Sequence, residues 1–286
     1  MSAAHSAPAR EMEFAFDAAD HAAISRLAYD EAGIVLPPGK AQLVYGRLAR
    51  RVRACGLDGF GAYVALLDED EGERARAIDA LTTNHTSFFR ENHHFEHFVA
   101  HAWPALNERL AGGGRVRLWS SACSSGEEPY SLVMAALGRD RRAAEQLARR
   151  DFRVLATDLS TDILAAARAG CYSAETIKTV PGDLRAAWVE RAGDEAQIRA
   201  EVRSLIAFRQ LNLLKPWPMR QPFDAIFCRN VMIYFDEATK ARLLSRLADC
   251  LVPGGFLYIG HSERLSPDIA ARFTCIGRTM FQKDAR

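Results

Sequence analysis

From Arg115 onward, short apolar segments alternate with helical ones, and this alternation constrains the fold more than any other feature of the sequence. The apolar segments are "VRLWSSA", "FRVLATDLS", "IAFRQLNLL", "FDAIFCRN" and "FLYIGHSE", followed by a closing "FTCIGRTMFQK". Strands that alternate with helices are typical of a parallel sheet covered by helices on both faces. We therefore expect an α/β fold in this part of the chain.

The sequence between Phe14 and about Ala80 follows a helical period instead. "DAADHAAISRLAYDEAG" has an Asp cap, apolar residues every three to four positions and a terminal glycine. The next segment, "GKAQLVYGRLARRVRACG", repeats this design. Its expected apolar side consists of Leu43, Tyr45, Leu48 and Val52. These patterns predict a small all-helical domain.

The two patterns divide the chain into four predicted parts. These are a disordered N-terminus (1–13), a helical domain (14–83), a linker (84–101) and the sheet domain (102–286). The connection between the second and third strands, about residues 171–204, is far longer than a usual crossover. We interpret it as a small inserted β-subdomain.

Composition excludes several classes of protein. The net charge of +1 over 286 residues gives no global electrostatic case for nucleic acid. No apolar run approaches the ~18 residues that a membrane span needs, and "MSAAHSAPAR" lacks the features of a secretory signal. The six cysteines are scattered, as is typical of free thiols in a reducing compartment. We expect a cytoplasmic protein without membrane insertion, and nothing suggests more than a monomer.

The first strand–turn–helix unit, "RVRLWSSACSSGEEPYSLVMAAL", resembles a nucleotide-binding unit with an unusual turn. It contains neither the dinucleotide glycine pattern nor a phosphate loop. One glycine, Gly126, precedes two carboxylates, Glu127 and Glu128, and the turn has no lysine or arginine. The helix dipole accounts for one of the glutamates. A nucleoside with a cationic tail fits better, and S-adenosylmethionine has a ribose, an ammonium and a sulfonium.

Ligands of open parallel sheets bind beyond the carboxyl ends of the strands, so residues at these ends are candidates. Asp158 ends the second strand, where such folds place an acid that accepts hydrogen bonds from the ribose hydroxyls. The alternative is a helix cap, although Ser160 or Thr161 could cap the same helix.

Two further strand ends carry candidates. Asn212 and Leu213 follow the third strand and could frame an adenine, but a plain turn is equally consistent with these residue types. Arg229 follows the fourth strand and is either a surface ion pair or a carboxylate clamp. Its position at a carboxyl strand end favours the clamp.

The segment "NHTSFFRENHHFEHF" joins the two predicted domains. His93 and His97 are four residues apart, as a metal pair on a helix would be, but no third ligand is identifiable. We expect a solvated helix surface there and no metal. Asn84 and Arg90 are of more interest, because domain junctions are preferred ligand sites.

The second predicted helix is strongly basic. It carries five cations and no acid: Lys40, Arg47, Arg50, Arg51 and Arg53. Such a run is usually a solvated face, but uncompensated charge also suits an acidic protein surface. The aromatic platforms of a single-strand nucleic-acid binder are absent.

Six segments together resemble the chemotaxis receptor methyltransferases, the CheR family. They are "LTTNHTSFFRENHHF", "WSSACSSGEEPYSL", "ATDLS", "NLL", "PFDAIFCRNVMIYFD" and "GGFLYIGHSE", in the order found in that family. The resemblance covers nearly the whole chain. It implies a Rossmann-like class I S-adenosylmethionine-dependent methyltransferase domain behind the helical domain. It also implies methyl transfer to glutamate side chains on the cytoplasmic helical bundle of chemoreceptors, with S-adenosylhomocysteine as product.

The resemblance implies roles for individual residues. Cofactor contacts are implied for Asn84, Thr86, Arg90, Glu128, Asp158, Asn212, Leu213, Arg229 and Asn230. Arg90 and Arg229 are expected to place carboxylates, either the cofactor's or the target's. Tyr234 matches a family tyrosine near the transferred methyl group. The basic helix, with Lys40, Arg47, Arg50, Arg51 and Arg53, corresponds to the receptor-docking helix of the family.

One departure from the family concerns the inserted subdomain. In some members, a loop there holds a short peptide from the receptor's C-terminus. The corresponding segment here, "WVERAGDEAQIRAEV", is a few residues shorter and lacks the glycine-flanked loop. We therefore expect no tether to a C-terminal pentapeptide.

Two other readings compete with this one. An amide- or base-directed methyltransferase usually carries Asn/Asp-Pro-Pro-aromatic after the fourth strand, where this chain has "CRNVMIYF". A binding module that holds receptor helices without methyl transfer is the second alternative. The intact set of Glu128, Asp158 and Arg229 disfavours it.

Overall fold

The computed structural model describes residues 13–82 and 84–285, and the chain divides into two compact units between residues 83 and 84. The predicted disorder of the N-terminus, apart from its last residue, lies outside the described residues. None of the described helices combines the length and the apolar character that crossing a bilayer requires.

The first unit is all-helical. Its elements are α1 (Ala18–Ala32), a 3-10 turn (Pro38–Lys40), α2 (Ala41–Ala54), α3 (Phe60–Glu69) and α4 (Glu71–Leu81). Asp17 and Asp20 form a capping box at the start of α1, and Gly33 ends the helix in the left-handed region at φ 67°. The caps expected from the sequence therefore form.

The apolar side of α2 differs from the prediction at one position. Val44, Leu48 and Val52 are fully buried, whereas Leu43 is 41% exposed. Residues spaced four apart lie on one side of a helix, and Leu43 is about 100° around the helix from Val44. The core of this unit therefore begins at Val44, and Leu43 belongs to the outer surface.

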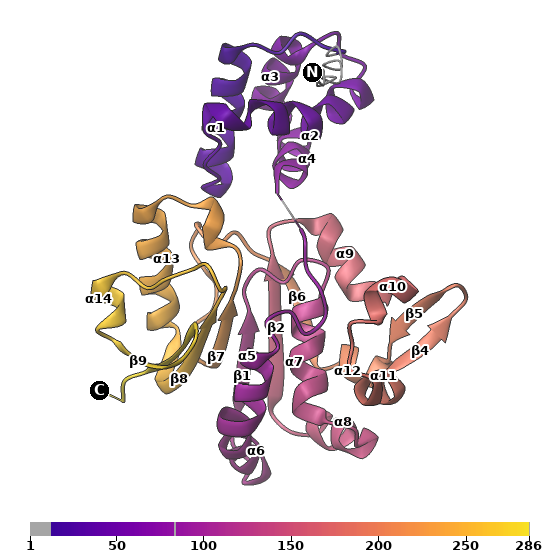
Figure 1. Ribbon diagram of the computed structural model, residues 1–286, viewed down its shortest axis with the longest axis vertical. Coiled ribbons are helices and arrows are strands. Elements are labelled where there is room, and N and C mark those ends of the chain that lie inside the picture. Colours follow the sequence, from indigo (N-terminus) through magenta and orange to yellow (C-terminus); the bar gives the residue numbers. More distant parts are fainter. Residues whose placement is uncertain (1–12, 83, 286) are drawn as a thin grey trace, which may run out of the picture. The chain divides into compact units, whose positions relative to one another are not determined.

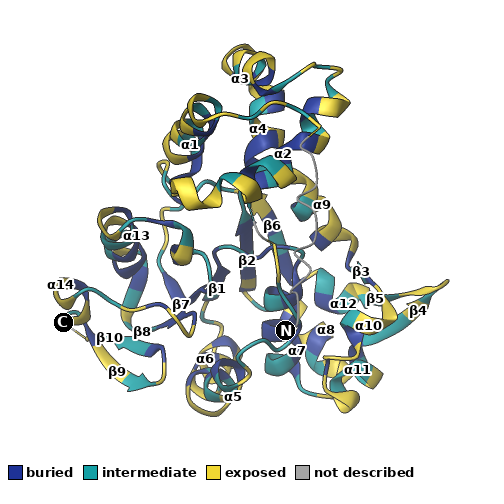
Figure 2. Cartoon of the chain, turned by 45° about the horizontal axis from the view of Figure 1, so that its top comes forward, coloured by how far each residue is buried: buried dark blue, intermediate teal, exposed yellow. Residues whose placement is uncertain are grey.

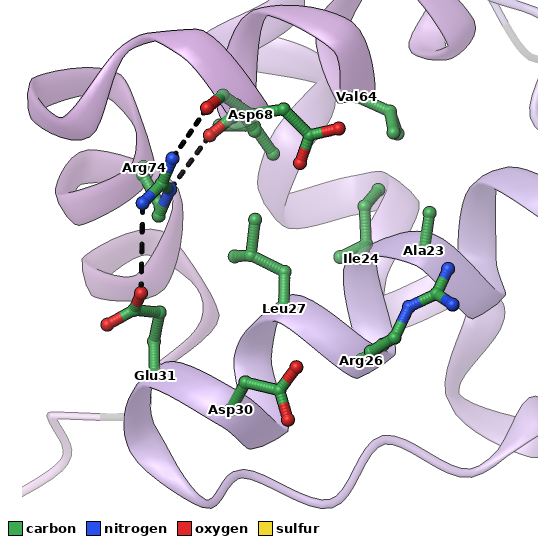
Figure 3. Close-up of a pocket in the computed structure, with 10 residues that line it drawn as sticks. Ala23, Ile24, Arg26, Leu27, Asp30, Glu31, Val64, Asp68 and Arg74 are labelled. Atoms are coloured by element: carbon green, nitrogen blue, oxygen red, sulfur yellow. Dashed lines mark hydrogen bonds and ion pairs between the residues drawn. The ribbon is translucent and has the colours of Figure 1, made fainter.

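A pocket of about 440 Å³ opens between α1, α3 and α4 (Figure 3). In Figure 3 the side chains of Ile24 and Leu27 rise from α1 toward Val64 of α3. Arg74 closes one side, where its guanidinium donates to the carbonyls of Leu67 and Asp68, 2.8 Å each. The floor is thus apolar and the rim charged.

The second unit contains a seven-stranded sheet in the order β6-β2-β1-β7-β8-β10-β9. The strands are β1 (Val116–Ser120), β2 (Phe152–Asp158), β6 (Ile206–Gln210), β7 (Phe223–Cys228), β8 (Leu251–Ile259), β9 (Phe273–Gly277) and β10 (Met280–Lys283). The five strands from β6 to β8 in this order are parallel, whereas β10 runs antiparallel to both of its neighbours. The closing "FTCIGRTMFQK" therefore forms a hairpin of two strands.

Helices cover both faces of this sheet, which confirms the predicted α/β architecture (Figure 1). On one face lie α7 (Glu127–Leu137), α8 (Arg141–Ala148) and α9 (Thr161–Ala169), whose apolar residues join one core cluster. On the other face, α13 (Glu237–Asp249) and α14 (Pro267–Ala270) contribute to a second cluster around Trp119. The central strand β7 is buried along its whole length.

Residues 84–101, treated as a linker in the sequence analysis, pack into the second unit. This segment contains α5 (His93–His97) and most of a π-helical turn (Phe98–Ala102), which leads into α6 (Trp103–Ala111). Phe88, Phe95 and Phe98 are buried in the core cluster of the α7 face. The histidines are less solvated than expected, because His97 Nδ1 lies 3.1 Å from the Tyr258 hydroxyl and His94 is fully buried.

The long connection after α9 forms a separate small sheet. Its elements are β3 (Cys171–Tyr172), α10 (Ala174–Ile177), α11 (Gly182–Trp188), β4 (Val189–Ala192), β5 (Glu195–Ile198) and α12 (Ala200–Arg203). The three strands pair antiparallel in the order β3-β5-β4. Only Gly193 and Asp194 link β4 to β5, and the hairpin is mostly half-buried or exposed (Figure 2). No additional loop interrupts it.

Candidate functional site

The turn between β1 and α7 requires its glycine. Gly126 adopts φ 99°, which L side chains rarely adopt. A Cβ at this position would lie 3.1 Å from Ala167 Cβ, from Tyr130 Cε2 and from the Tyr172 hydroxyl. The main chain therefore turns sharply here and places Glu127 and Glu128 on the first turn of α7.

Asp158 ends β2 beside this turn and holds it in place. Its Oδ2 accepts a hydrogen bond from the Ser124 main-chain N–H at 2.8 Å, and its Oδ1 accepts one from the Ser160 N–H at 3.2 Å. The cap of α9 is Ser160, whose hydroxyl accepts from the Ile163 N–H. Asp158 is thus not needed as a helix cap. Burial raises the pKa of its carboxyl above the usual range.

Arg229 lies beyond β7, and its side chain is only 2% exposed, so it is not a surface residue. Its guanidinium donates to Glu128 Oε2 at 3.1 Å and also to the main-chain carbonyl of Arg90. It lies 3.7 Å from Glu91 Oε2 and stacks over the Phe95 ring. Burial raises the pKa of Glu128, and Arg229 and the Ser120 hydroxyl only partly counteract this rise.

Two glutamates of this region were not among the predicted site residues. The first, Glu91, accepts from Asn230 Nδ2 at 3.3 Å and lies 3.2 Å from His261 Nδ1. Burial alone would raise its pKa, but Arg229, Asn230 and His261 outweigh burial and lower it. Its position next to Arg90 was the only available signal.

The second glutamate, Glu263, is 5% exposed and binds three main-chain N–H groups. Its carboxylate accepts from Gly260 at 2.6 Å, from Met232 at 2.8 Å and from Asn230 at 3.2 Å. It therefore ties the loop after β8 to the loop after β7. Burial raises its pKa despite these hydrogen bonds. The motif "GHSE" directly after β8 contains this residue, but the motif alone does not indicate its partners.

Several residues in the segments around Arg229 and Asp158 have left-handed backbone conformations. Phe89, Glu91, Ser124 and Asn230 have φ values of 55°, 53°, 48° and 58°. Such conformations are uncommon outside glycine and persist where the surrounding structure fixes them, often at functional sites. Here a hydrogen bond to Asp158 holds the main chain of Ser124. Hydrogen bonds to Glu91 and Glu263 hold Asn230.

Acidic side chains outnumber basic ones in this cluster. Its carboxylates are Glu91, Glu127, Glu128, Asp158 and Glu263, and the buried cation among them is Arg229. Burial raises the pKa of four of these carboxyls: Glu127, Glu128, Asp158 and Glu263. A positively charged ligand would offset the excess of carboxylates over cations. Hydroxyl groups of a ligand could donate hydrogen bonds to Asp158. S-adenosylmethionine therefore fits these residues. In the described part of the chain, no three His, Cys, Asp or Glu side chains are grouped as a metal site would need.

The structure brings some predicted cofactor residues together. Arg229 donates to both Glu128 and the Arg90 carbonyl, and the Asn84 carbonyl accepts from the Ser124 hydroxyl at 3.1 Å. The Arg90 guanidinium donates to the His85 carbonyl at 2.9 Å and is only half-buried.

The remaining candidates lie on other segments. Asn212 forms a turn in which its Oδ1 accepts from the Leu214 N–H at 2.9 Å, and Leu213 packs in the core cluster of the α13 face. Thr86 is half-buried in the segment before α5. Tyr234 is half-buried in the 3-10 turn Met232–Tyr234, five residues after Arg229.

More of the positive charge on the basic helix α2 is paired with acidic residues than its sequence indicates. Arg51 Nε donates to the buried Glu73 of α4 at 2.9 Å, and Arg53 pairs with Glu13. Arg47 donates to the main-chain carbonyls of Leu81 and Thr82. Lys40 and Arg50 are exposed and in no ion pair with a described residue. The expectation of five unpaired cations is therefore wrong, because acids from other segments reach α2.

Comparison with known proteins extends these observations to nearly the whole chain. Residues 84–281 match the family described as "CheR methyltransferase, SAM binding domain", and residues 19–82 match "CheR methyltransferase, all-alpha domain". A probable chemotaxis protein methyltransferase of Rhizobium etli is 45% identical over 90% of this chain and 96% of its own length. The chemotaxis protein methyltransferase of Escherichia coli is 41% identical over 90% of this chain and 88% of its own. The chain belongs to the CheR methyltransferase family, with the all-helical domain and the S-adenosylmethionine-binding domain of that family in succession.

Proposed function

We propose that this protein transfers methyl groups from S-adenosylmethionine to glutamate side chains on the cytoplasmic helical bundle of chemoreceptors. The observation that carries the proposal is the excess of buried carboxylates around Arg229, at the carboxyl ends of parallel strands, where ligands of open sheets usually bind. The named activity of the relatives supports the receptor as the substrate.

We assign different parts of the cofactor to different residues of the chain. We assign Asp158, at the end of β2, to accept hydrogen bonds from the ribose, and Glu128, on the first turn of α7, to attract the cationic tail. Asn212 and Leu213 are assigned to the adenine. Asn84, Thr86 and Asn230 are assigned to the remaining cofactor contacts. When bound, S-adenosylmethionine supplies the methyl group and a sulfonium leaving group.

The reaction demands little acid–base chemistry from the protein. A glutamate carboxylate has a reference pKa of about 4.3 and is already a nucleophile at neutral pH. No general base is needed, so the residues contribute mainly by alignment and by excluding water. Arg229 is held by Glu128 and the Arg90 carbonyl and is therefore rigid. We assign Arg90 and Arg229 to placing carboxylates, and Tyr234 to orienting the target.

We assign docking of the receptor to the helical domain, residues 14–83. Lys40, directly before α2, and Arg50 of α2 remain available for an acidic helical surface. The short β4–β5 hairpin supports recognition of the receptor body without a pentapeptide tether. We propose that the protein acts as a monomer in the cytoplasm.

Methyl transfer is tested with radiolabelled S-adenosylmethionine and a purified cytoplasmic fragment of a chemoreceptor. We expect label on the receptor that base releases as volatile methanol, because glutamate methyl esters hydrolyse in base. Receptor variants with Ala at the candidate glutamates should lose this label. Cofactor binding without any label on the receptor would contradict the proposal and favour a binding module.

Docking is tested separately by reversing one charge. Arg50→Glu should slow receptor methylation about tenfold and leave cofactor affinity unchanged, because like charges across an interface are unfavourable. Arg26→Glu is the matched control, since Arg26 is an exposed arginine of α1 in the same unit. Equal slowing by both variants would argue against a specific role of α2.

A further inference from the structure

A pocket with three arginines lies at the edge strand β6, outside the site described above. It measures about 290 Å³ and is lined by Arg168 of α9, Arg203 of α12 and Ile206–Arg209 of β6. Because β6 is the last strand on its side of the sheet, one side of its main chain has no neighbouring strand in the part of the chain that the structure describes. None of these residues belongs to the cofactor cluster.

The three guanidinium groups are held by main-chain carbonyls. Arg168 donates to the Phe208 carbonyl at 3.2 Å, Arg209 to the same carbonyl at 2.8 Å, and Arg203 to the Ala169 carbonyl at 3.5 Å. A guanidinium has five N–H donors, so these bonds leave most donors of each group unused. Among the described residues, the buried Nε of Arg203 has no hydrogen-bond partner.

Neighbouring arginines contrast with these three. Arg199 pairs with Glu190 at 2.7 Å, and Arg141 pairs with Glu201 at 2.8 Å. None of the described carboxylates forms such an ion pair with Arg168, Arg203 or Arg209. The pocket itself has no acidic lining residue. Three like charges are thus gathered from three elements without a counterion in the described chain.

Helix capping explains only part of this arrangement. Arg168 and Arg203 are near the C-terminus of α9, where cations are favourable. Arg209 comes from the strand and has no such role. Its guanidinium is bonded to the same carbonyl as that of Arg168, so the two charges lie close together. An anion between these groups would offset their repulsion, and planar arginine forks suit phosphate oxygens.

We propose that this pocket binds the phosphate groups of a small anionic ligand. The lining offers three guanidinium donors, and its larger apolar side chains, Ile206 and Phe208, are buried rather than open to a ligand. Recognition would therefore depend on the phosphates rather than on an attached apolar group. The site is separate from methyl transfer, so its occupancy can be measured without activity.

The test is calorimetric titration of the purified chain with inorganic pyrophosphate, at ionic strength held constant with sodium chloride. We expect saturable binding that Arg209→Gln weakens about tenfold, the loss typical of one charge-assisted contact. Arg209 is exposed and its side-chain bond is local, so this variant should fold normally. Thermal unfolding with and without pyrophosphate gives a second readout, since a bound ligand raises the melting temperature.

Arg153→Gln is the matched control. Arg153 is also exposed, also on a strand and also donates to the carbonyl of the preceding residue, at 2.7 Å, but it lies outside the pocket. Absence of binding, or equal weakening in both variants, would overturn the proposal. A parallel titration with ADP identifies the source of the phosphates: tighter binding than pyrophosphate indicates a nucleotide, and equal binding indicates the phosphates alone.

Discussion

Arg229 and Glu128 are 101 positions apart in the sequence, yet their side chains meet at 3.1 Å beyond the adjacent ends of β7 and β1. Both side chains are almost completely shielded from solvent, at 2% and 11% exposure. The strand order of the sheet makes this contact possible, because β1 and β7 are neighbours. The pair therefore links two halves of the sheet at the point where the cofactor should bind.

Removal of the Arg229 charge should destabilise the fold. In Arg229→Met the carboxylates of Glu128 and Glu91 would remain buried without their cation, which typically costs about 3–5 kcal/mol. Urea denaturation measures the free energy of unfolding. Arg272→Met is the control, because Arg272 pairs with Asp249 at the surface and such pairs contribute about 0–1 kcal/mol. Similar losses in both variants would show that Arg229 is not an essential counterion.

Substitutions at Asp158 and at Ser160 should distinguish the effect of cofactor binding from the effect of helix capping. Asp158→Asn removes the charge expected to bind the ribose and should weaken S-adenosylmethionine binding about tenfold or more in calorimetry. Ser160→Ala removes the cap of α9 and should lower stability by about 1 kcal/mol, with cofactor affinity preserved. Unchanged affinity in Asp158→Asn would rule out the ribose role.

Glu263 should act as a positioning residue for the loop that carries Asn230. Glu263→Gln retains one acceptor oxygen for three N–H groups and should weaken cofactor binding several-fold, since the loop loses its fixed conformation. Asp224→Asn is the matched control. Asp224 is 5% exposed, at the opposite end of β7, and binds Arg109 and the Arg117 N–H. If both variants lose stability and cofactor affinity in the same proportion, Glu263 has only a structural role.

The raised pKa values of the buried carboxyls predict opposite pH effects on stability and on binding. Glu127, Glu128, Asp158 and Glu263 have pKa values above their unfolded values of about 4, so the folded protein holds more protons in that window. The free energy of unfolding of the ligand-free protein should therefore fall as pH rises from about 4 through these raised values.

Affinity for S-adenosylmethionine should increase over the same pH window, because ionised carboxylates attract its cationic groups. Adenosine, which has the ribose but no cationic tail, should gain less. Calorimetric titration of both ligands between pH 5 and 8, in steps of about one unit, measures the difference. Identical pH profiles for the two ligands would argue against an electrostatic role of Glu128.

The sequence predicted the parts of this structure that follow from periodicity and topology. Strand–helix alternation was sufficient for the α/β sheet, and parallel strand ends meet at one edge, so Glu128, Asp158 and Arg229 were identifiable as candidates. The turn at Gly126 was also identifiable, because a glycine between a strand and a helix is a local signal.

Contacts between separate segments were not predictable in this way. Glu91 and Glu263 depend on partners 139 and about 30 positions away, and no local pattern indicates such pairing. The compensation of Arg51 by Glu73 likewise depends on how α2 and α4 cross. Burial of Val44 rather than Leu43 was decided by the exact angular position of the helix against its neighbours.

The position of β10 has a consequence for how the sheet is completed during synthesis. Although β10 is the last of the described strands along the chain, it lies between β8 and β9, and β9 has no other partner among them. While Met280–Lys283 are still inside the ribosome, β9 has nothing to pair with and β8 has an open edge. Unpaired strand edges favour aggregation. A nascent chain of this protein should therefore be most vulnerable to aggregation in the interval after β8 has emerged from the ribosome and before β10 has emerged.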